Sequence, residues 1–519
     1  MSKNIMDAIK EENADSTLIN TENGALGYAF CRSALVDFFY KISSFRKASA
    51  DEKTVAFRKA LTEDKDLGYR MLFFSRDVRQ GLGERQLFRD VFKSLDEAHQ
   101  IALIKLIPEY GRWDDALALL DDGISVELMN AIVDLVHKQF DKDLKDAKAG
   151  KPISLLAKWM PSIRKVNKKK VELAKFLCRK FGLQERDYRH ALSALREHLK
   201  VVEKQMSAQK WDTIDYEAVP SKAAKLYRGA FMKHDETRYR EYLDKLEKGE
   251  AKVNASTLYP YEIVTAYRDA GGWSHTIGNY DKLLEAQWKA LPLPKGILGN
   301  AIVVRDGSGS MTSQVSGKTT ALDVATSLAV LMSEHLQGPF KDKFITFSAR
   351  PKFIDLSGCD NLKQKLETTF GQDACSNTNV EATMDLILRA AVKNHLKQEE
   401  IPAVVIVSDM EFDEARQQGY HYNWTEAKMA NDQKVLFETI REKWNAAGYD
   451  LPKMVFWNVC SRTGAVPLQE NANGLLLVSG FSQNILDMLA GDGTMMDVIK
   501  QKLNTERYDP VSAAIKGLA

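Results

Sequence analysis

A short turn past the middle of the chain carries three oxygen-bearing side chains at every second position. The segment NAIVVRDGSGSM (300–311) places Asp306, Ser308 and Ser310 directly after an apolar run. Side chains two residues apart in extended backbone point to the same side, so the three groups converge, and the glycines between them let the backbone bend. One carboxylate and two hydroxyls are hard oxygen ligands, which suit Mg²⁺ or Mn²⁺ and not zinc or copper. The turn therefore predicts part of a divalent-cation site.

Two further segments offer oxygens that could complete such a site. SNTNVEATMDLIL puts Thr378 in a polar loop before a helical pattern, and VVIVSDMEF puts Asp409 just after an apolar strand pattern. Each motif has an ordinary alternative, because GSGS is a flexible-linker composition, Thr378 can cap a helix and Asp409 can end a strand. A serine-hydrolase elbow and a Walker loop are excluded, since the required glycines and the GK[ST] triplet are missing. The joint occurrence of these residues favours the metal site.

The elements that would position these residues follow ALPLPKGILGN (290–300), which has the composition of a linker. The expected strands are 301–305, 343–347, 352–356, 402–408, 453–459 and 474–479, and the expected helices are 319–336, 360–369, 380–396, 426–446 and 482–490. Continuous apolar strands that alternate with amphipathic helices predict a doubly wound parallel sheet covered on both faces. Ligands of such sheets bind at the carboxyl ends of the strands, where Asp306 and Asp409 would both lie.

The chain before the linker has a different pattern. Residues 25–290 are helical almost throughout, and in RHALSALREHLKVVEKQM one stripe runs from Leu192 to Val202. Many amphipathic helices joined by short loops predict an α-solenoid of HEAT type, or a globular bundle. We therefore expect an α + α/β protein. A HEAT-like helical-repeat domain would cover 1–295, a Rossmann-like α/β domain 296–492, and a helical tail 493–519.

Length and composition limit the class of protein. The 519 residues are too many for one core, and contents of 44% hydrophobic and 28% charged residues are typical of a soluble globular protein. Residues 1–15 lack the apolar core of a signal peptide, and no apolar run is long enough to span a membrane. Five cysteines without CxxC spacing argue against a zinc site and a disulfide framework. We expect a cytoplasmic protein.

The net charge of +2 hides an asymmetry. Residues 1–300 hold 51 Lys and Arg against 44 Asp and Glu (+7), and residues 301–519 hold 22 against 27 (−5). Residues 151–200 alone hold 14 basic and 4 acidic residues (+10), with basic side chains concentrated at Arg164, Lys165, Lys168, Lys169, Lys170, Lys175, Arg179 and Lys180. Such a bias predicts a polyanionic partner for the first part of the chain, and RNA is the one that a cytoplasmic protein most often meets. Neither DNA nor a membrane is expected as a partner.

The sequence from residue 300 to about 490 resembles a von Willebrand factor A domain. Asp306, Ser308, Ser310, Thr378 and Asp409 match its metal-ion-dependent adhesion site one for one. The resemblance implies that the two serines and the threonine bind Mg²⁺ or Mn²⁺ directly, that the aspartates bind directly or through water, and that a partner protein supplies a further carboxylate. The chain departs from the family at Arg305, where a small or apolar residue is usual. An arginine there could pair with a nearby acid and weaken the affinity for divalent cations.

The helical part has a resemblance of its own. RDVRQGLGERQLFRDVF (76–92), YGRWDDAL (110–117), LLAKWMPS (155–162) and WDTIDYEAVPSKA (211–223) resemble an uncharacterised family that fuses helical repeats to an A domain. That architecture is similar to the TROVE module and A domain of the Ro autoantigen family, whose members bind RNA. The resemblance implies a ribonucleoprotein that holds a Y-RNA-like or misfolded non-coding RNA, with an exoribonuclease as one protein that could engage the metal site.

Three functions compete at this point. A non-catalytic RNA-binding protein with a Mg²⁺-dependent protein contact explains the charge asymmetry and ranks first. A protein-interaction adaptor, for example a partner of an AAA+ ATPase, explains the metal motif but gives no use to the basic segment, and ranks second. A metal-assisted phosphohydrolase ranks last, because two serines and a threonine form a neutral, weakly polarising shell and no histidine lies near them in sequence.

Overall fold

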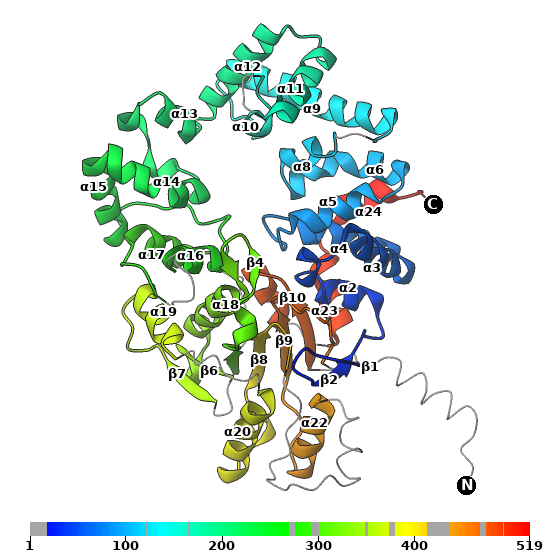
Figure 1. Ribbon diagram of the computed structural model, residues 1–519, viewed down its shortest axis with the longest axis vertical. Helices are drawn as coiled ribbons and strands as arrows, with labels where there is room; N and C mark the ends of the chain where they lie inside the picture. The colour runs from blue at the N-terminus through cyan, green and yellow to red at the C-terminus, as the bar shows by residue number, and fades with distance from the viewer. Residues whose placement is uncertain are drawn as a thin grey trace. The chain divides into compact units, whose positions relative to one another are not determined.

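The computed structural model describes residues 18–120, 123–163, 167–268, 276–292, 300–347, 351–372, 379–412, 436–467, 474–490 and 493–518 (Figure 1). By its internal contacts the chain divides into two compact units. The first, here called the sheet unit, comprises Met1–Met71 and Leu258–Asn504, and the second, the helical unit, comprises Leu72–Thr257 and Thr505–Ala519. The domain boundaries expected at 295 and 492 follow changes of sequence pattern. These units follow packing, which groups the first helices of the chain with the sheet.

A six-stranded sheet forms the centre of the sheet unit. Its strands are β3 (Ala301–Arg305), β6 (Lys343–Thr346), β7 (Lys352–Asp355), β8 (Ala403–Ser408), β9 (Met454–Asn458) and β10 (Leu475–Ser479), in the order β10-β9-β8-β3-β6-β7. All six lie within one residue of the expected strands. Every residue of β3, β9 and β10 is buried, as continuous apolar strands require.

The expectation of an all-parallel sheet is wrong at one edge. β7 pairs antiparallel to β6, while the other five strands are mutually parallel. Only residues 347–351 join β6 to β7. Parallel neighbours need a crossover of a dozen or more residues. A link this short allows only an antiparallel hairpin.

Helices and 3-10 turns surround this sheet. They are α2 (Ala34–Tyr40), η1 (Ser44–Arg46), α3 (Ala50–Glu63), the start of α4 (Lys65–Arg76), α16 (Pro260–Tyr267), α17 (Lys282–Lys289), η5 (Gly309–Thr312), α18 (Ala321–His335), η6 (Gly338–Phe340), α19 (Leu362–Phe370), α20 (Val380–Lys393), η7 (Gln398–Glu400), α22 (Leu436–Ala446), η8 (Gln483–Ala490) and α23 (Met495–Leu503). α18 is buried along almost its whole length and packs on β3, β6 and β8, while α2 and α23 pack on β10. The first half of the helix expected at 426–446 lies outside the described residues.

Two short strand pairs accompany the sheet. β4 (Gln314–Ser316) and β5 (Thr319–Thr320) follow the Asp-Gly-Ser-Gly-Ser turn. Near the start of the chain, β1 (Leu18–Asn20) and β2 (Leu26–Tyr28) form an antiparallel hairpin where a helical pattern was expected from residue 25. Strands of three residues are too short to show an alternating pattern, which explains why the sequence did not reveal them.

The helical unit consists of packed helices with short connections. Its elements are α5 (Arg85–Lys93), α6 (Glu97–Leu103), η2 (Ile104–Leu106), α7 (Ile107–Tyr110), α8 (Trp113–Leu117), α9 (Val126–Lys148), α10 (Leu156–Trp159), α11 (Lys168–Lys180), α12 (Glu185–His198), α13 (Val202–Ser207), η3 (Trp211–Thr213), η4 (Tyr216–Ala218), α14 (Ser221–His234), α15 (Glu236–Glu247) and α24 (Asp509–Ile515). The helical tail expected from residue 493 is thus divided, with α23 on β10 in the sheet unit and α24 on α6 in the helical unit. No described helix is long and apolar enough to cross a membrane.

The apolar stripe expected from Leu192 to Val202 is interrupted. α12 ends at His198, Lys200 adopts a left-handed backbone conformation (φ 48°), and α13 begins at Val202. Residues other than glycine rarely adopt this backbone conformation, so a lysine at this position did not indicate a break in the helix. The chain changes direction here and two short helices replace one long one.

Candidate metal centre

Strand register brings the two aspartates of the motif to neighbouring positions at one edge of the sheet. Arg305 pairs with Val407 in adjacent parallel strands, and the amide of Asp306 donates to the carbonyl of Val407 (3.0 Å). Asp306, the first residue after β3, is therefore level with Ser408, the last residue of β8. Asp409 follows Ser408 directly. Both aspartates are fully buried. Buried apolar strands thus deliver two carboxylates to the place where open α/β sheets bind ligands.

The side chains of the Asp-Gly-Ser-Gly-Ser turn are linked by short hydrogen bonds. The Asp306 carboxylate accepts from the Ser408 hydroxyl (2.5 Å) and from the Ser308 amide (2.9 Å). Ser308 Oγ and Ser310 Oγ lie 2.9 Å apart, and the Ser310 hydroxyl is close enough to Asp409 to lower the pKa of its carboxyl. Four of the five expected ligands therefore converge. The fifth, Thr378, lies outside the described residues.

The electrostatics of this cluster suit a cation. Burial, and then the negative charge of Asp306, raise the pKa of Asp409 to about 7, against a partial opposing effect of Arg462. Burial also raises the pKa of Asp306. Two carboxylates that share a buried place disfavour each other's charge, and a bound divalent cation would remove that penalty. Within the described ranges no three His, Cys, Asp or Glu side chains are grouped to hold a metal. A cation at this edge would therefore depend on two carboxylates and the serine hydroxyls, a donor set that fits Mg²⁺ or Mn²⁺.

Arg305, the departure from the family pattern, does not enter the cluster with its guanidinium. The side chain is fully buried, its Nε donates to Thr326 Oγ1 on α18 (2.9 Å), and its guanidinium lies 5.8 Å from the ring centre of Phe370 on α19. Successive side chains of a strand point to opposite faces, which separates Arg305 from Asp306. Its positive charge still lowers the pKa of Asp306, but by less than the hydrogen bonds from Ser408 and Ser308 do.

A different arginine contacts the cluster directly. Arg462, in the loop after β9, places Nη1 3.2 Å from an Asp409 carboxylate oxygen and 3.5 Å from the Ser310 carbonyl oxygen. Its Nε lies 2.5 Å from a carboxylate oxygen of Glu22, in the turn between β1 and β2. Neither residue could be predicted from the sequence, because a single arginine and a single glutamate far apart in the chain carry no spacing signal. A positive charge thus already lies beside one of the expected metal ligands.

Glu411 fixes the loop that carries Arg462. One of its carboxylate oxygens accepts from the amides of Arg462 (2.7 Å) and Thr463 (2.9 Å) and from the Ser461 hydroxyl (3.2 Å). The other accepts from the amide of Glu22 (2.9 Å). Glu411 is fully buried, so these donors replace the water that its charge would otherwise need. Its role is to hold the loop and the N-terminal turn against the end of β8.

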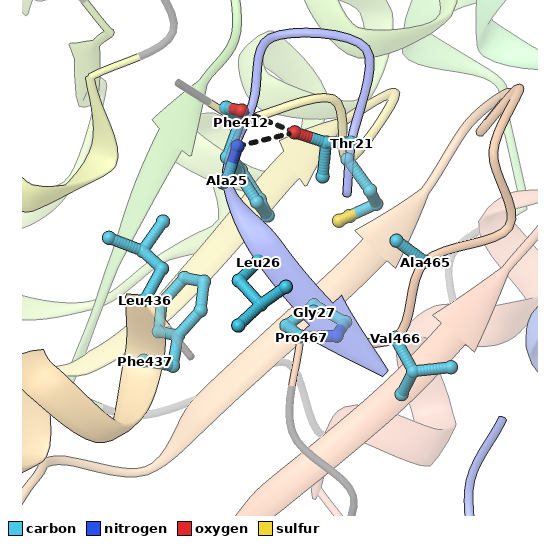
Figure 2. Close-up of a pocket in the computed structure, with 11 residues that line it drawn as sticks. Thr21, Ala25, Leu26, Gly27, Phe412, Leu436, Phe437, Ala465, Val466 and Pro467 are labelled. Atoms are coloured by element: carbon cyan, nitrogen blue, oxygen red, sulfur yellow. Dashed lines mark hydrogen bonds between the residues drawn. The ribbon is translucent and has the colours of Figure 1, made fainter. Parts of the chain in front are cut away.

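The β1–β2 hairpin closes the side of this edge. The Thr21 hydroxyl donates to the carbonyl of Phe412 (2.6 Å), and Tyr28 exchanges two backbone hydrogen bonds with Val466 (2.9 and 2.7 Å). Figure 2 shows β2 lying between Leu436 and Phe437 on one side and Ala465 and Val466 on the other. The space left among these residues is about 10 Å³, room for about one water molecule. Among the described residues, the hairpin is therefore closely packed against this edge of the sheet.

The basic residues expected to bind RNA lie on or just before α11 in the helical unit. Arg164 and Lys165 lie outside the described residues. The other six are exposed, at Lys168, Lys169, Lys170, Lys175, Arg179 and Lys180. Glu185 lies 3.4 Å from Lys175, and Lys180 Nζ lies 3.5 Å from Asn130 Oδ1 and 5.8 Å from the ring centre of Phe176. Among the described residues, Lys175 is thus the one of the six with an acidic neighbour, and the three lysines of the first turn have none.

Comparisons with known proteins give two family models that match separate parts of the chain. Residues 121–292 match the model of one domain of unknown function (DUF2828), and residues 300–516 match that of another (DUF7788). The uncharacterized protein L728 of Acanthamoeba polyphaga mimivirus is 30% identical over 531 residues, which cover 95% of this chain and 86% of the viral protein. The crystal structure of the Deinococcus radiodurans RO (RSR) protein aligns with 88% of this chain and 90% of its own, at 15% identity and a TM-score of 0.33. That score is too low to carry its fold or function over to this chain.

Proposed function

This chain belongs to the family of the mimivirus protein L728, and we propose that it is a non-catalytic RNA-binding protein whose helical unit holds the RNA. The observation that carries the proposal is the first turn of α11. Lys168, Lys169 and Lys170 occupy its first three positions, all exposed, and no acidic residue balances them in that turn. Among the described residues none of the three has an ion-pair partner.

Positive charge in the first turn of a helix lowers the stability of that helix. The amino end of a helix carries a partial positive charge and exposes unpaired N–H groups, so acidic residues are favoured there and lysines are not. Three lysines in the first turn therefore work against the stability of α11. A phosphate backbone reverses the sign of the effect, because anions bind well at helix amino ends and between lysines. This is why we favour a polyanionic ligand over a merely solvated face.

The RNA is proposed to be a structured or misfolded non-coding RNA, as in the Ro family, with the helical unit as a HEAT-like, TROVE-like module. Contacts made by lysines are mainly to phosphates, so recognition would depend on RNA shape more than on sequence. In the adaptor alternative the basic turn has no ligand. The two functions differ in whether the full-length chain carries RNA.

The RNA content of the purified protein tests this function. Full-length chain prepared at low salt without nuclease is expected to show a raised ratio of absorbance at 260 to 280 nm, and sequencing of the extracted nucleic acid should give discrete non-coding RNAs. Nuclease treatment before the last purification step should remove both signals. Protein that is free of nucleic acid in both preparations would contradict the proposal and favour the adaptor.

The sheet unit is proposed to bind Mg²⁺ or Mn²⁺ for contact with a protein partner that supplies a carboxylate. Asp306, Ser308, Ser310 and Asp409 would hold the ion together with Thr378, and the ion would supply a positive charge to the partner's carboxylate. The convergence of four of these side chains at the sheet edge supports this role. Neutral hydroxyl ligands polarise a bound water weakly, so we propose no hydrolytic activity.

Replacing Arg462 by glutamine is expected to tighten Mn²⁺ binding by about tenfold, or about 1.4 kcal/mol. The guanidinium contacts Asp409 and repels a cation bound at the same carboxylate, and the substitution removes that charge. Titration calorimetry of the full-length chain with Mn²⁺ measures the change.

Arg268→Gln is the matched control. Arg268 also pairs with a fully buried aspartate of the sheet unit, Asp323 (2.8 Å), and its side chain is 20% exposed against 21% for Arg462. This control should leave Mn²⁺ affinity unchanged. Equal affinities in wild type and Arg462→Gln would show that Arg462 does not compete with the ion.

A further inference from the structure

The break between α12 and α13 leaves a cavity in the helical unit. Its volume is about 520 Å³, within the range of roughly 300–1,000 Å³ that is usual for small-ligand pockets. Side chains from α10, from the loop after it, from α12 and from α13 line the cavity. It therefore depends on the left-handed turn at Lys200, which gives α13 a direction of its own.

The lining is strongly cationic. Lys158, Arg189, Arg196 and Lys204 face a single carboxylate, that of Glu203. Arg196 is held by neutral acceptors, the carbonyl oxygens of Ala157 (2.8 Å) and Met160 (2.7 Å) and the Ser162 hydroxyl (2.9 Å). Its charge is therefore positioned but not neutralised.

The other cations of the lining differ in how far they are neutralised. Lys204 is paired with Glu197, 3.0 Å away. Arg189 donates only to a backbone carbonyl, that of Glu185 (3.3 Å), and no ion pair is seen for Lys158 or Arg189 among the described residues. The cavity thus has uncompensated positive charge on the α10 and α12 walls, which suits an anion such as a phosphate.

Glu203, on the α13 wall, has an unused acceptor. One carboxylate oxygen accepts from the Tyr227 hydroxyl (3.2 Å). The other, Oε2, is buried and has no hydrogen-bond partner among the described residues. A buried carboxylate oxygen without a donor is unfavourable. The oxygen has no exposed surface in this conformation, but the Glu203 side chain is only half-buried and lines the cavity, so a rotation of its carboxylate would present the oxygen to an N–H donor of a ligand.

We propose that this cavity binds one unstacked nucleotide of the RNA, with its phosphate on Lys158 and Arg189 and the donor edge of its base on Glu203. The inference rests on the proposed RNA-binding function and names a site within it. Proteins that recognise RNA sequence do so largely through bases taken out of the stack, whose Watson–Crick edges are then free. In this cavity the cationic wall would bind the phosphate of such a nucleotide, and the carboxylate opposite would bind its base.

The carboxylate favours guanine. The Watson–Crick edge of guanine has two adjacent donors, N1–H and the N2 amino group, which match the two acceptors of a carboxylate. Adenine and cytosine offer one amino group beside a ring-nitrogen acceptor, and uracil offers one N–H between two carbonyl groups. Those acceptors would face the carboxylate unfavourably. We expect GMP to bind best and UMP worst.

Ligand-observed NMR of the full-length chain with GMP, AMP, CMP and UMP tests the site. Wild type should bind GMP at least about tenfold more tightly than UMP. Glu203→Gln should remove that preference, and Lys158→Ala should weaken all four nucleotides alike. Asp187→Asn and Lys151→Ala are the matched controls, because both residues are charged and exposed, belong to the helical unit and lie outside the lining. Ser193→Phe, which adds a ring at an exposed lining position, should block binding without disturbing the core.

The outcomes separate this site from RNA binding itself. Wild type that binds long RNA but none of the four nucleotides, or that binds GMP and UMP equally, overturns the nucleotide site and leaves the proposed function standing. Wild type that binds neither nucleotides nor RNA overturns both. A GMP preference lost in Glu203→Gln and kept in Asp187→Asn supports the site, provided that the thermal transitions of both variants match wild type.

Discussion

Asp306→Asn is expected to abolish Mn²⁺ binding by the full-length chain. The substitution keeps the shape of the side chain and its place between Ser408 and the Ser308 amide, and removes one of the two carboxylate charges. Loss of residues that only support metal ligands typically costs 10- to 100-fold in affinity, so loss of a charged ligand should cost more than about 100-fold. Titration calorimetry with Mn²⁺ measures the affinity directly.

Thermal unfolding gives an independent check on the same variant. In chelator, Asp306→Asn should be at least as stable as wild type, because it removes one of two buried like charges. Wild type should gain about 2.7 kcal/mol when Mn²⁺ is present at 100 times its Kd, and the variant should gain nothing. Asp355→Asn, at an exposed aspartate of the same unit, should behave as wild type. Equal Mn²⁺ affinity in Asp306→Asn and wild type would mean that the site is wrongly assigned.

Much of the sheet could be predicted because its strands are buried on both faces. A run such as Val404–Val407 is apolar at every position, and this pattern differs from that of an amphipathic helix. The order of strands follows less directly from sequence. The antiparallel pairing of β7 depends on the length of its link to β6, and residues 352–356 look like any other strand.

The candidate site was predictable only where its residues follow a strand in the sequence. Asp306 and Asp409 each come directly after an apolar run, which places them at the carboxyl edge of the sheet. Arg462 and Glu22 reach the same place through hydrogen bonds to Glu411, from a loop and from a hairpin of three-residue strands. Contacts between short irregular segments depend on the finished fold, so no local pattern announces them.

In the helical unit, too, the sequence predicts the helices better than it predicts the contacts between them. The helix over 168–180 follows from its apolar spacing, and the basic side chains are exposed because the stripe around Leu177 is buried. The cavity between α10, α12 and α13 depends on the backbone conformation of Lys200, a residue type that gives no warning of a left-handed turn. The charges could therefore be read from sequence, and the pocket could not.

Reversal of Lys168, Lys169 and Lys170 to glutamate is expected to weaken RNA binding by at least tenfold at physiological salt. Each phosphate contact that is lost should reduce the slope of log affinity against log salt concentration by about 1, and many RNAs should be affected alike. The helix itself should become more stable, because each glutamate in its first turn contributes about 0.3–1 kcal/mol with the dipole. Lost binding in this variant therefore cannot be ascribed to unfolding, and Mn²⁺ affinity at Asp306 should not change.

The most direct test of RNA binding by the helical unit is fluorescence anisotropy with a labelled structured RNA, measured over a series of salt concentrations. Three proteins are compared: wild type, the triple variant at Lys168, Lys169 and Lys170, and a control with Lys341, Lys352 and Lys397 changed to glutamate. Both variants change the net charge from +2 to −4, so they differ only in where the charge is reversed. We predict that the control binds RNA with the affinity and salt slope of wild type. The α11 variant should bind RNA more weakly and with a shallower salt slope. RNA binding that is equal in the two variants would contradict the assignment to α11, and no binding by wild type would contradict the function itself.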